Sequence, residues 1–520
     1  MYENGKIYMG LSQSGEKVYM QPSQSNRHGL IAGASGTGKT ITMKVMAESF
    51  SAAGVPVFLC DVKGDVSGLA EIGADNSGMQ KRIDKFGIRD TFTFRSYPVT
   101  FWDLCGKNGL PVRTTISDMG PDILSRVLGL TEVQEGVLNI IFRIADDHDL
   151  KLIDLKDLRA MLKLVGEKRA EYSLEYGNMA AQSIGAISRA LIPLEDQGGE
   201  LFFGEPMLDI RDWIRTDFDG RGMINILHAV ETVNTPKLYA AFLLWMMAEL
   251  FENLPEAGDA DKPKIVFFFD EAHLLFDDVP KALVQKIEQT VKLIRSKGVG
   301  IYFVTQSPSD IPDPVLAQLS NRVQHALRAY TPAEQKAVRT AAKTFRPNPA
   351  FNTEDKIMTL GTGEALTSFL DEEGIPGIVD HTAIICPESL MAPCADSTRS
   401  SIISGSFLAS KYSESVDNES AYEKLAQEAQ KQAELDEIAR QKAELEEERR
   451  KLEEDKAKAE AEAEKKAQKE AEKKAKEEEK KKAQKEKAAE RRRAKIETQL
   501  ISTGGQLLKR GLLGILKFGK

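Results

Sequence analysis

Eight consecutive residues close to the start of the printed sequence have the types and spacing that bind a triphosphate. Residues 33–40 read Gly-Ala-Ser-Gly-Thr-Gly-Lys-Thr, which fits the pattern GxxxxGK[ST]. A short apolar run, 29–32, precedes the pattern, and a stretch with helical character, 40–50, follows it. In this strand–loop–helix context the pattern indicates a nucleotide-binding loop rather than a glycine-rich turn without a ligand.

Each residue type in this loop has a chemical reason to be there. Glycines allow backbone N–H groups to turn inward around phosphates, and the start of the helix adds a partial positive charge. The Lys39 amine would reach the β- and γ-phosphates, and the Thr40 hydroxyl would be a ligand of Mg²⁺. We therefore expect ATP and Mg²⁺ as cofactors. The residues expected to contact the nucleotide are Gly33, Ala34, Ser35, Gly36, Thr37, Gly38, Lys39, Thr40 and Ile41.

A pair of acids follows a second apolar run, 264–269. A carboxylate at the end of a buried strand beside the phosphate loop can hold Mg²⁺ through water, and we assign this role to Asp270. Glu271 would then polarise the attacking water. The alternative is that the two acids only begin a surface loop. His273 is expected to cap the following helix rather than to act in catalysis.

A polar amide follows the apolar run 300–305. At the tip of a strand next to the magnesium strand, Gln306 could sense the γ-phosphate; the alternative is a simple strand terminus. More than two hundred residues and at least one candidate strand separate Lys39 from Asp270. This separation suggests the class of phosphate-loop ATPases that has an additional strand between these two residues.

Up to about residue 400, short apolar runs alternate with helical stretches, which predicts an α/β fold with a mainly parallel sheet. The candidate strands are 28–32, 55–60, 91–94, 222–228, 264–269, 300–305 and 323–329. We expect an ATPase core over 1–106 and 221–400, interrupted by a helical insertion over 107–220. The helices expected in that insertion are 118–128, 131–147, 155–166 and 180–191.

The composition changes sharply after about residue 420. Residues 401–422 are expected to wrap the core, and 423–499 form a Lys/Glu/Ala tract with no Leu, Ile, Val, Met or aromatic residue between Leu452 and Ile496. Because a coiled coil needs apolar positions in every heptad, the tract predicts a long solvated helix held by Glu–Lys pairs, with a partly disordered spacer as the alternative. The segment 500–520 is apolar and basic, and it is expected to dock on this chain or a neighbouring subunit or to lie on a membrane surface.

The overall composition excludes several classes. A hydrophobic fraction of 42% with 29% charged residues excludes a chain that is disordered throughout. No apolar run approaches the length of a transmembrane helix, and the four cysteines have no metal-ligand spacing, so we expect a cytoplasmic protein without a transmembrane segment. Residues 421–520 carry a net charge of +5 and the other 420 carry −14, so nothing in the bulk charge favours nucleic acid.

Taken together, these motifs resemble the HerA–FtsK division of P-loop ATPases, and more narrowly the bacterial YjgR type of HerA-like helicase. The matching pieces are the loop at 33–40, the acidic turn at 61–65, the pair Asp270 and Glu271, the turn at 295–300, and Gln306. The resemblance implies a RecA-like core that binds ATP and Mg²⁺. It also implies a ring-shaped homo-oligomer, a hexamer, which translocates double-stranded DNA.

The resemblance implies a site shared between subunits, which an arginine of the neighbouring subunit completes. Arg295 and Arg27 stand at family-like positions, and Arg322 is a weaker third candidate. Because the phosphate loop begins at residue 33, the sequence leaves no room for the N-terminal β-barrel of fuller relatives, and a partner nuclease is not implied.

Two other function classes remain open from the sequence. One is a secretion or conjugation-type ATPase that associates peripherally with membrane through the C-terminal segment. The other is a slow P-loop ATPase that serves as a scaffold. A helicase of the class that also reads Asp-Glu-Ala-His would need a second RecA-like domain with an arginine-rich motif, and residues after 306 show none.

Overall fold

The computed structural model describes residues 1–231, 235–258, 260–276 and 281–481 of the 520-residue chain. The chain divides into two compact units, Met1–Gln427 and Glu428–Lys520. The second unit is described only along helix α16 (Ala421–Lys481). The sheet and all other helices described here belong to the first unit.

One thirteen-stranded sheet organises the first unit, with the path β1-β2-β13-β12-β11-β4-β10-β9-β5-β8-β6-β7 and β3 paired to β2. Every neighbouring pair from β11 to β7 is parallel, and the pairs on the other side are antiparallel. The predicted α/β class with a mainly parallel sheet is therefore confirmed. The strands are β1 (Tyr2–Glu3), β2 (Lys6–Ser12), β3 (Lys17–Met20), β4 (Gly29–Ala32), β5 (Val57–Asp61), β6 (Val99–Asp103), β7 (Leu110–Pro111), β8 (Ile224–His228), β9 (Ile265–Phe269), β10 (Val299–Thr305), β11 (Asn321–His325), β12 (Glu364–Ser368) and β13 (Asp380–Ile384).

One predicted strand is wrong. Residues 91–94 are not a strand, because the backbone N–H groups of Thr91 and Phe92 both bond to the carbonyl oxygen of Ile88 and turn the chain. The Phe92 and Phe94 rings then meet edge to face, 5.0 Å apart. The alternating phenylalanines thus contact each other instead of forming a strand. The strand that pairs with β8 is β6, a few residues later.

The strands on the antiparallel side were not predicted. Strand β2 pairs with β13, and Gly10 lies so close to it that a side chain there would meet the carbonyl oxygen of Ala383 at 1.9 Å. The first residues of the chain thus extend the same sheet through pairings that are more than 360 residues apart in sequence.

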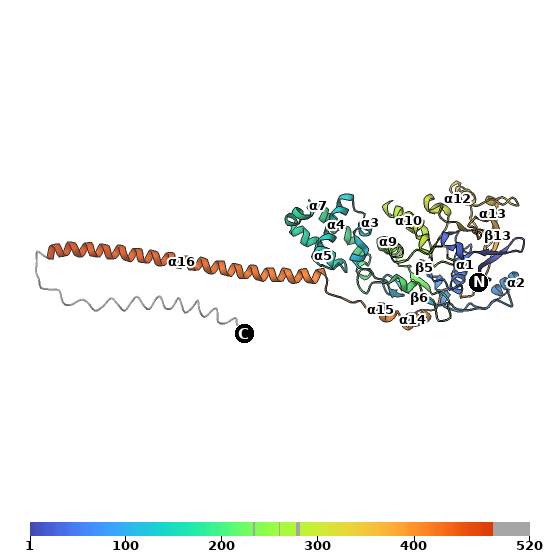
Figure 1. Ribbon diagram of the computed structural model, residues 1–520, viewed down its shortest axis with the longest axis horizontal. Coiled ribbons are helices and arrows are strands. Elements are labelled where there is room, and N and C mark those ends of the chain that lie inside the picture. Colours follow the sequence, from blue (N-terminus) through green and yellow to red (C-terminus); the bar gives the residue numbers. More distant parts are fainter. Residues whose placement is uncertain (232–234, 259, 277–280, 482–520) are drawn as a thin grey trace. The chain divides into compact units, whose positions relative to one another are not determined.

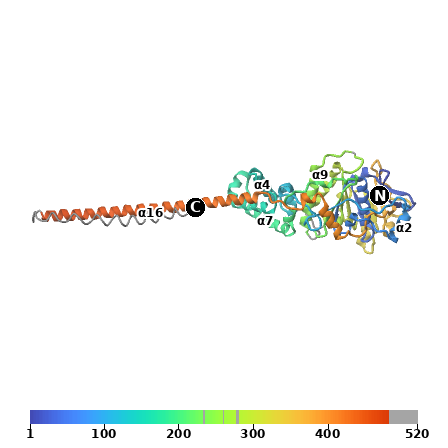
Figure 2. The same ribbon diagram turned by 90° about the horizontal axis from the view of Figure 1, so that it is seen from below.

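Apolar side chains of the parallel strands alternate between two faces. Val266 and Phe268 pack with helix α1 (Lys39–Ala52) on one face, whereas Phe267 and Phe269 pack with helix α9 (Pro236–Asn253) on the other. Both faces are therefore covered, which explains why these strands are apolar at every position. Figures 1 and 2 place α4 at one end of this unit and α2 (Ser77–Phe86) at the other.

Six helices lie between β7 and β8 in the sequence. They are α3 (Ile116–Leu128), α4 (Glu132–Asp147), α5 (Leu155–Glu167), α6 (Arg169–Tyr176), α7 (Ala181–Asp196) and α8 (Gly199–Phe202). Their apolar side chains share one core with α9 and with one face of the sheet. The helices predicted within 107–220 are therefore present, and they pack as part of the first unit.

Other helices complete the first unit. They are α10 (Lys281–Leu293), α11 (Asp313–Leu316), α12 (Pro332–Lys343), α13 (Thr353–Thr359), α14 (Asp396–Gly405) and α15 (Ala409–Tyr412). Short 3₁₀ turns include 22–27, 66–70, 210–213, 272–275, 294–297 and 308–310. Within the described residues, no helix combines the length and apolar composition that crossing a bilayer requires.

The chain after β13 returns along the first unit to the start of α16. The Arg399 guanidinium lies over the Phe101 ring of β6, 4.7 Å from its centroid. The buried Tyr412 hydroxyl donates to the Asp212 carboxylate at 2.6 Å. Tyr412, within the predicted wrapping segment, thus contacts the segment before β8, and Arg399, just before that segment, contacts β6.

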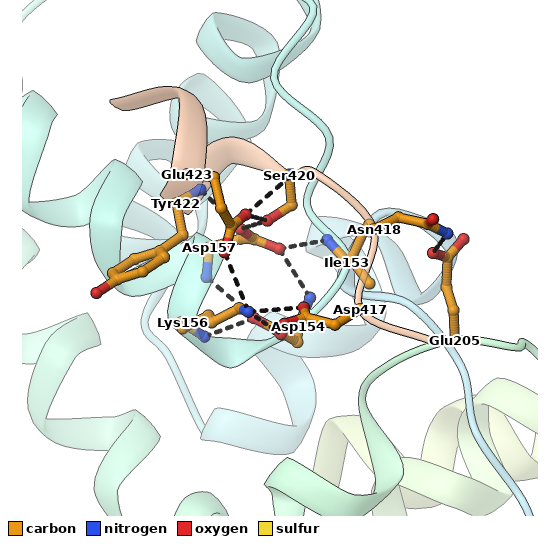
Figure 3. Close-up of polar contacts among 10 residues, drawn as sticks. All are labelled: Ile153, Asp154, Lys156, Asp157, Glu205, Asp417, Asn418, Ser420, Tyr422 and Glu423. Atoms are coloured by element: carbon orange, nitrogen blue, oxygen red, sulfur yellow. Dashed lines mark hydrogen bonds and ion pairs between the residues drawn. The ribbon is translucent and has the colours of Figure 1, made fainter. Parts of the chain in front are cut away.

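The start of α16 is held by one fully buried carboxylate, Asp157, near the start of α5 (Figure 3). One oxygen of Asp157 accepts from the backbone N–H groups of Ile153 and Asp154, at 2.8 and 3.0 Å. The other accepts from the Ser420 hydroxyl and the Tyr422 N–H, at 2.5 and 2.8 Å. Asp157 therefore caps the N-termini of α5 and α16 together.

Helix α16 spans 61 residues. From residue 426 onward, its described side chains are exposed. Pairs such as Lys451 with Glu447, at 2.9 Å, follow the i,i+4 spacing expected for a solvated helix. The predicted long charged helix is confirmed up to residue 481; residues 482–499 and the apolar basic segment 500–520 lie outside the described residues.

Candidate active site

The carboxyl ends of four parallel strands bring the predicted chemical groups to one edge of the sheet. In the order β4-β10-β9-β5, the phosphate loop follows β4 and Gln306 follows β10, while Asp270 follows β9 and Asp61 ends β5. Loops at this edge of an open parallel sheet are where such folds bind ligands. Strand β10 separates β4 from β9, as expected for the class with an additional strand.

The phosphate loop turns through backbone conformations that require glycine. Gly36 and Gly38 have φ angles of 74° and 120°. At Gly33 a side chain would come within 2.5 Å of the His325 Cβ atom. The Lys39 amine donates to the carbonyl oxygens of Gly33 and Ala34, at 2.6 and 3.2 Å, so it lies inside the curve of the loop.

A buried histidine at the end of β11, His325, packs against this loop. The Nδ1 of His325 lies 2.9 Å from the carbonyl oxygen of Glu364, which can only accept, so Nδ1 carries the proton. Its Nε2 then accepts from the Thr42 hydroxyl, also at 2.9 Å. Burial lowers the pKa of His325 to about 4, with a smaller contribution from the Lys39 charge, and keeps the ring neutral.

The turn after β5 lies beside Thr40, the second residue of α1. The Thr40 hydroxyl donates to one oxygen of Asp65 at 3.3 Å. Asp61 accepts the backbone N–H of Gly64 at 2.7 Å, and this bond closes the turn. Thr40, the predicted metal ligand on α1, therefore faces an acidic turn rather than open solvent.

Four buried carboxylate oxygens at this edge have no hydrogen-bond partner within the described residues. They are Asp61 Oδ2, Asp65 Oδ1, Asp270 Oδ2 and Glu271 Oε2. Unpaired buried carboxylate oxygens are costly unless a cation or a donor occupies the site. Their placement near Thr40 and the phosphate loop fits a bound nucleotide with Mg²⁺.

The coordination expected of such an ion fits the side chains at the edge. In the described part of the chain, no group of three His, Cys, Asp or Glu side chains is arranged to hold a metal by itself. Mg²⁺ normally takes one or two protein ligands and fills its shell with phosphate oxygens and water. Thr40 and Asp270 could supply the protein ligands, which makes the metal dependent on the nucleotide.

The electrostatics of these acids follow from their burial. Burial raises the pKa of Asp270 to about 6, and the negative charge of Glu271 adds to this, while Lys63 opposes it. Burial also raises the pKa of Asp61 to about 7, with a contribution from Asp65. A divalent cation would offset both shifts, because it favours the charged form of each carboxylate.

Glu271 is held by two side chains. The Lys63 amine forms an ion pair with Glu271 Oε1, and the His273 Nδ1 lies 3.3 Å from Oε2. Burial, the largest single effect, would raise the pKa of Glu271, but Lys63, His273 and Lys39 together lower it. His273 was expected to cap the next helix; instead the turn 272–275 begins after Glu271, and His273 contacts that carboxylate.

Gln306 lies between the phosphate loop and the acid pair, as predicted from its strand. Its side chain is exposed, and no hydrogen bond to it is found among the described residues. The adjacent turn is fixed by Asp310, which accepts from the Thr305 hydroxyl at 2.6 Å and from the Ser307 N–H at 2.9 Å. Two hydrogen bonds thus hold the turn after the strand, while the Gln306 side chain faces solvent.

The two candidate arginines lie at the opposite edge of the sheet. Arg27 precedes β4, and Arg295 precedes β10, whereas the phosphate loop follows β4. Arg27 donates to the carbonyl oxygen of Gly374 at 3.3 Å, and Arg295 is exposed. Arg322 donates to three backbone carbonyl oxygens of this chain, at 2.8 to 3.1 Å. Neither Arg27 nor Arg295 approaches the phosphate loop of its own chain.

Three contributors to the site were missed from the sequence. No motif in the sequence predicts the contacts that Lys63, Asp65 and His325 make, although the first two lie within the acidic turn at 61–65. The chemical signal for Lys63 was available, since a lysine in a turn after a parallel strand lies at the same edge as the acid pair. His325 could not be found, because its partners are more than 30 residues away along the chain.

Three solved structures that are similar to this chain have low sequence identity to it. The chain is similar to the plasmid coupling protein TrwB in complex with the non-hydrolysable ATP analogue ADPNP, at 14% identity over 75% of this chain and 93% of that chain, with a TM-score of 0.48. It is also similar to VirB4 of Thermoanaerobacter pseudethanolicus, at 15% identity over 74% and 97%, with a TM-score of 0.47. TrwB in complex with ADP and Mg²⁺ gives 15% identity over 74% and 91%, with a TM-score of 0.44.

The comparison of sequences gives the family. No curated protein matches the chain. A family model described as "Helicase HerA-like C-terminal" matches residues 7–520, in agreement with the resemblance found in the motifs, and the chain therefore belongs to this family.

Proposed function

We propose that this protein is an ATPase that uses Mg²⁺ and ATP to translocate double-stranded DNA, working as a ring-shaped homo-oligomer, a hexamer. The observation that carries the proposal is the placement of the phosphate loop and the Asp270–Glu271 pair at one edge of the sheet, separated by one strand that ends in Gln306. Membership of the HerA-like helicase family supports the DNA cargo and the ring.

Each residue at this edge has a role in the proposed reaction. The N–H groups of the phosphate loop and the Lys39 amine would bind the phosphates, and Lys39 would exchange its bonds to Gly33 and Ala34 for them. Thr40 and Asp270 would hold Mg²⁺, which neutralises charge on the phosphates when it is bound. Glu271 would accept the proton of the attacking water.

The link to movement would run through Gln306 and the subunit boundary. An exposed amide between the phosphate loop and the acid pair can bond to the γ-phosphate and lose that bond after hydrolysis. An arginine from the opposite edge of a neighbouring subunit, Arg295 or Arg27, would neutralise charge on the transferring phosphoryl group. Such a finger contributes roughly 10³–10⁵ in rate.

The proposal is tested by the ATP hydrolysis rate with and without long double-stranded DNA, repeated across salt concentration. We expect stimulation by DNA that weakens as salt rises, because phosphate contacts release counterions. Hydrolysis that DNA leaves unchanged at every salt concentration would favour a slow ATPase scaffold. Absence of hydrolysis with intact nucleotide binding would contradict the catalytic assignment.

A further inference from the structure

Lys63 connects two neighbouring strands at the candidate site. It lies in the turn after β5, and its amine reaches across to the carboxylate of Glu271, which follows β9. The Lys63 side chain is 41% exposed, whereas that of Glu271 is only 9% exposed. The lysine therefore approaches a nearly buried carboxylate from the solvent side.

The two oxygens of Glu271 are in different environments. Oε1 is paired with the Lys63 amine. Oε2 makes no hydrogen bond within the described residues, and the His273 Nδ1 lies 3.3 Å from it. This arrangement suits a general base, because one oxygen fixes the orientation of the group and the other keeps a lone pair for a proton.

The backbone at both ends of the contact is constrained. Glu271 has φ 46° and ψ 50°, a left-handed conformation that residues with side chains rarely adopt. Gly64 follows Lys63 with φ 82°, and its N–H is held by Asp61. Strained backbone persists only where the surroundings impose it, and the ion pair with Lys63 is one of the contacts that hold Glu271 in this conformation.

We propose, on the basis of the function proposed above, that Lys63 is a positioning residue for the hydrolysis step. It holds the Glu271 carboxylate by Oε1 so that Oε2 is directed at the attacking water. Lys63 acts through Glu271 and does not bind the phosphates. The charge pair crosses from β5 to β9, so the acidic turn at 61–65 takes part in the site through this lysine as well as through Asp65.

The test compares Lys63→Met with wild type for nucleotide affinity and for turnover. We expect kcat to fall roughly 10²-fold, the effect of misplacing a reacting group by about 1 Å, while the Kd for a non-hydrolysable ATP analogue stays unchanged. Lys63→Arg keeps a cation and should retain more turnover than Lys63→Met. In a Glu271→Gln background, Lys63→Met should cause no further loss, because residues that act as a unit are not additive.

Lys17→Met serves as the matched control. Lys17 pairs with Glu3 at 2.7 Å and is 45% exposed, close to the value for Lys63, but it lies in β3 away from the site. Its turnover should equal that of wild type. If Lys63→Met fails to fold, Lys63→Gln replaces it.

Three results overturn the inference. Unchanged kcat in Lys63→Met and Lys63→Gln would remove the positioning role. A weaker Kd with unchanged kcat would make Lys63 a phosphate ligand. A further loss in the Glu271→Gln background would show that Lys63 acts on another group. A wild-type protein that does not hydrolyse ATP contradicts the proposed function itself, so the two failures are distinguishable.

Discussion

The amine of Lys39 donates a 2.6 Å hydrogen bond to the carbonyl oxygen of Gly33, six residues earlier in the same loop. The lysine is buried at 5% exposure, and burial lowers its pKa, with the nearby Lys63 charge adding to that shift. Within the described residues this buried amine bonds only to neutral carbonyls, so binding an anion would stabilise its charge. The phosphate loop is therefore already in a conformation that suits phosphate binding.

Replacing Lys39 by alanine should abolish ATP binding while leaving the fold intact. The loop turns through its glycines, whose backbone conformations do not depend on the lysine. Titration calorimetry with a non-hydrolysable ATP analogue and Mg²⁺ measures the effect, and Lys17→Met, in β3 away from the phosphate loop, is the control. Retained affinity in Lys39→Ala would remove the assignment of the phosphate site.

Replacing Glu271 by glutamine should separate binding from hydrolysis. The amide keeps the shape of the side chain but cannot take a proton, so turnover should fall by about 10²–10⁴-fold with nucleotide affinity preserved. Phosphate release under saturating ATP measures turnover. Undiminished turnover would exclude Glu271 as the base.

The arginine assignment can be tested by mixing subunits. Arg295→Ala and Arg27→Ala proteins each keep an intact phosphate loop, and Lys39→Ala keeps both arginines. If the finger acts on a neighbouring subunit, mixtures of the correct arginine variant with Lys39→Ala should show more activity than either protein alone. Mixtures that stay inactive, although labelled subunits demonstrably exchange, would count against an arginine in trans.

The pKa values of two buried histidines lead to a prediction of how the free energy of unfolding depends on pH. Burial lowers the pKa of His28 and of His325 to about 4. The unfolded chain therefore binds more protons than the folded chain as the pH falls below about 6.5, and stability present at neutral pH is lost between about 6.5 and 4. Each histidine accounts for about 3 kcal/mol of this loss.

Denaturant unfolding at several pH values measures the effect. The His28 ring accepts from the Ile301 N–H at 3.1 Å and contacts the Val291 carbonyl oxygen at 2.8 Å, so a change at this position also costs stability at neutral pH. In His28→Asn, the dependence of the unfolding free energy on pH between 4 and 6.5 should become shallower by up to about one proton. An unchanged slope would contradict a neutral His28.

Asp157 gives a prediction about the base of α16. Asp157→Ala would leave the N–H groups of Ile153, Asp154 and Tyr422 without their acceptor in a buried site. The free energy of unfolding should fall by roughly 3 kcal/mol or more. Asp417→Ala is the control, because Asp417 is 79% exposed and, in the part of the chain that the structure describes, pairs only with Lys156. Equal effects of the two changes would contradict the buried cap.

The parts of the site that consist of residues close together in the sequence could be predicted from it. The phosphate loop, Asp270, Glu271 and Gln306 all follow apolar runs, and parallel strands bring their carboxyl ends to one edge whatever the intervening lengths. The helices of 107–220 could be predicted because the features that favour a helix are also local, and the structure adds local caps such as Asp154 before α5.

The remaining features depend on contacts between distant segments. No pattern in residues 1–20 predicts that β2 pairs with β13. No pattern around Ser420 predicts its hydrogen bond to Asp157. The run 91–94 has strand-like composition, yet a turn at Ile88 and the contact of its two phenylalanines override it. The Lys63–Glu271 pair becomes visible only once β5 and β9 are known to be neighbours.

The central claim is that a triphosphate with Mg²⁺ binds at the loop containing Lys39 and faces Asp270 and Glu271. A structure determined with a non-hydrolysable ATP analogue and Mg²⁺ tests it most directly. We predict phosphates within hydrogen-bonding distance of the Lys39 amine and of the loop N–H groups, with the metal beside Thr40 and Asp270. An empty loop under saturating ligand, or an analogue bound elsewhere, would contradict the account.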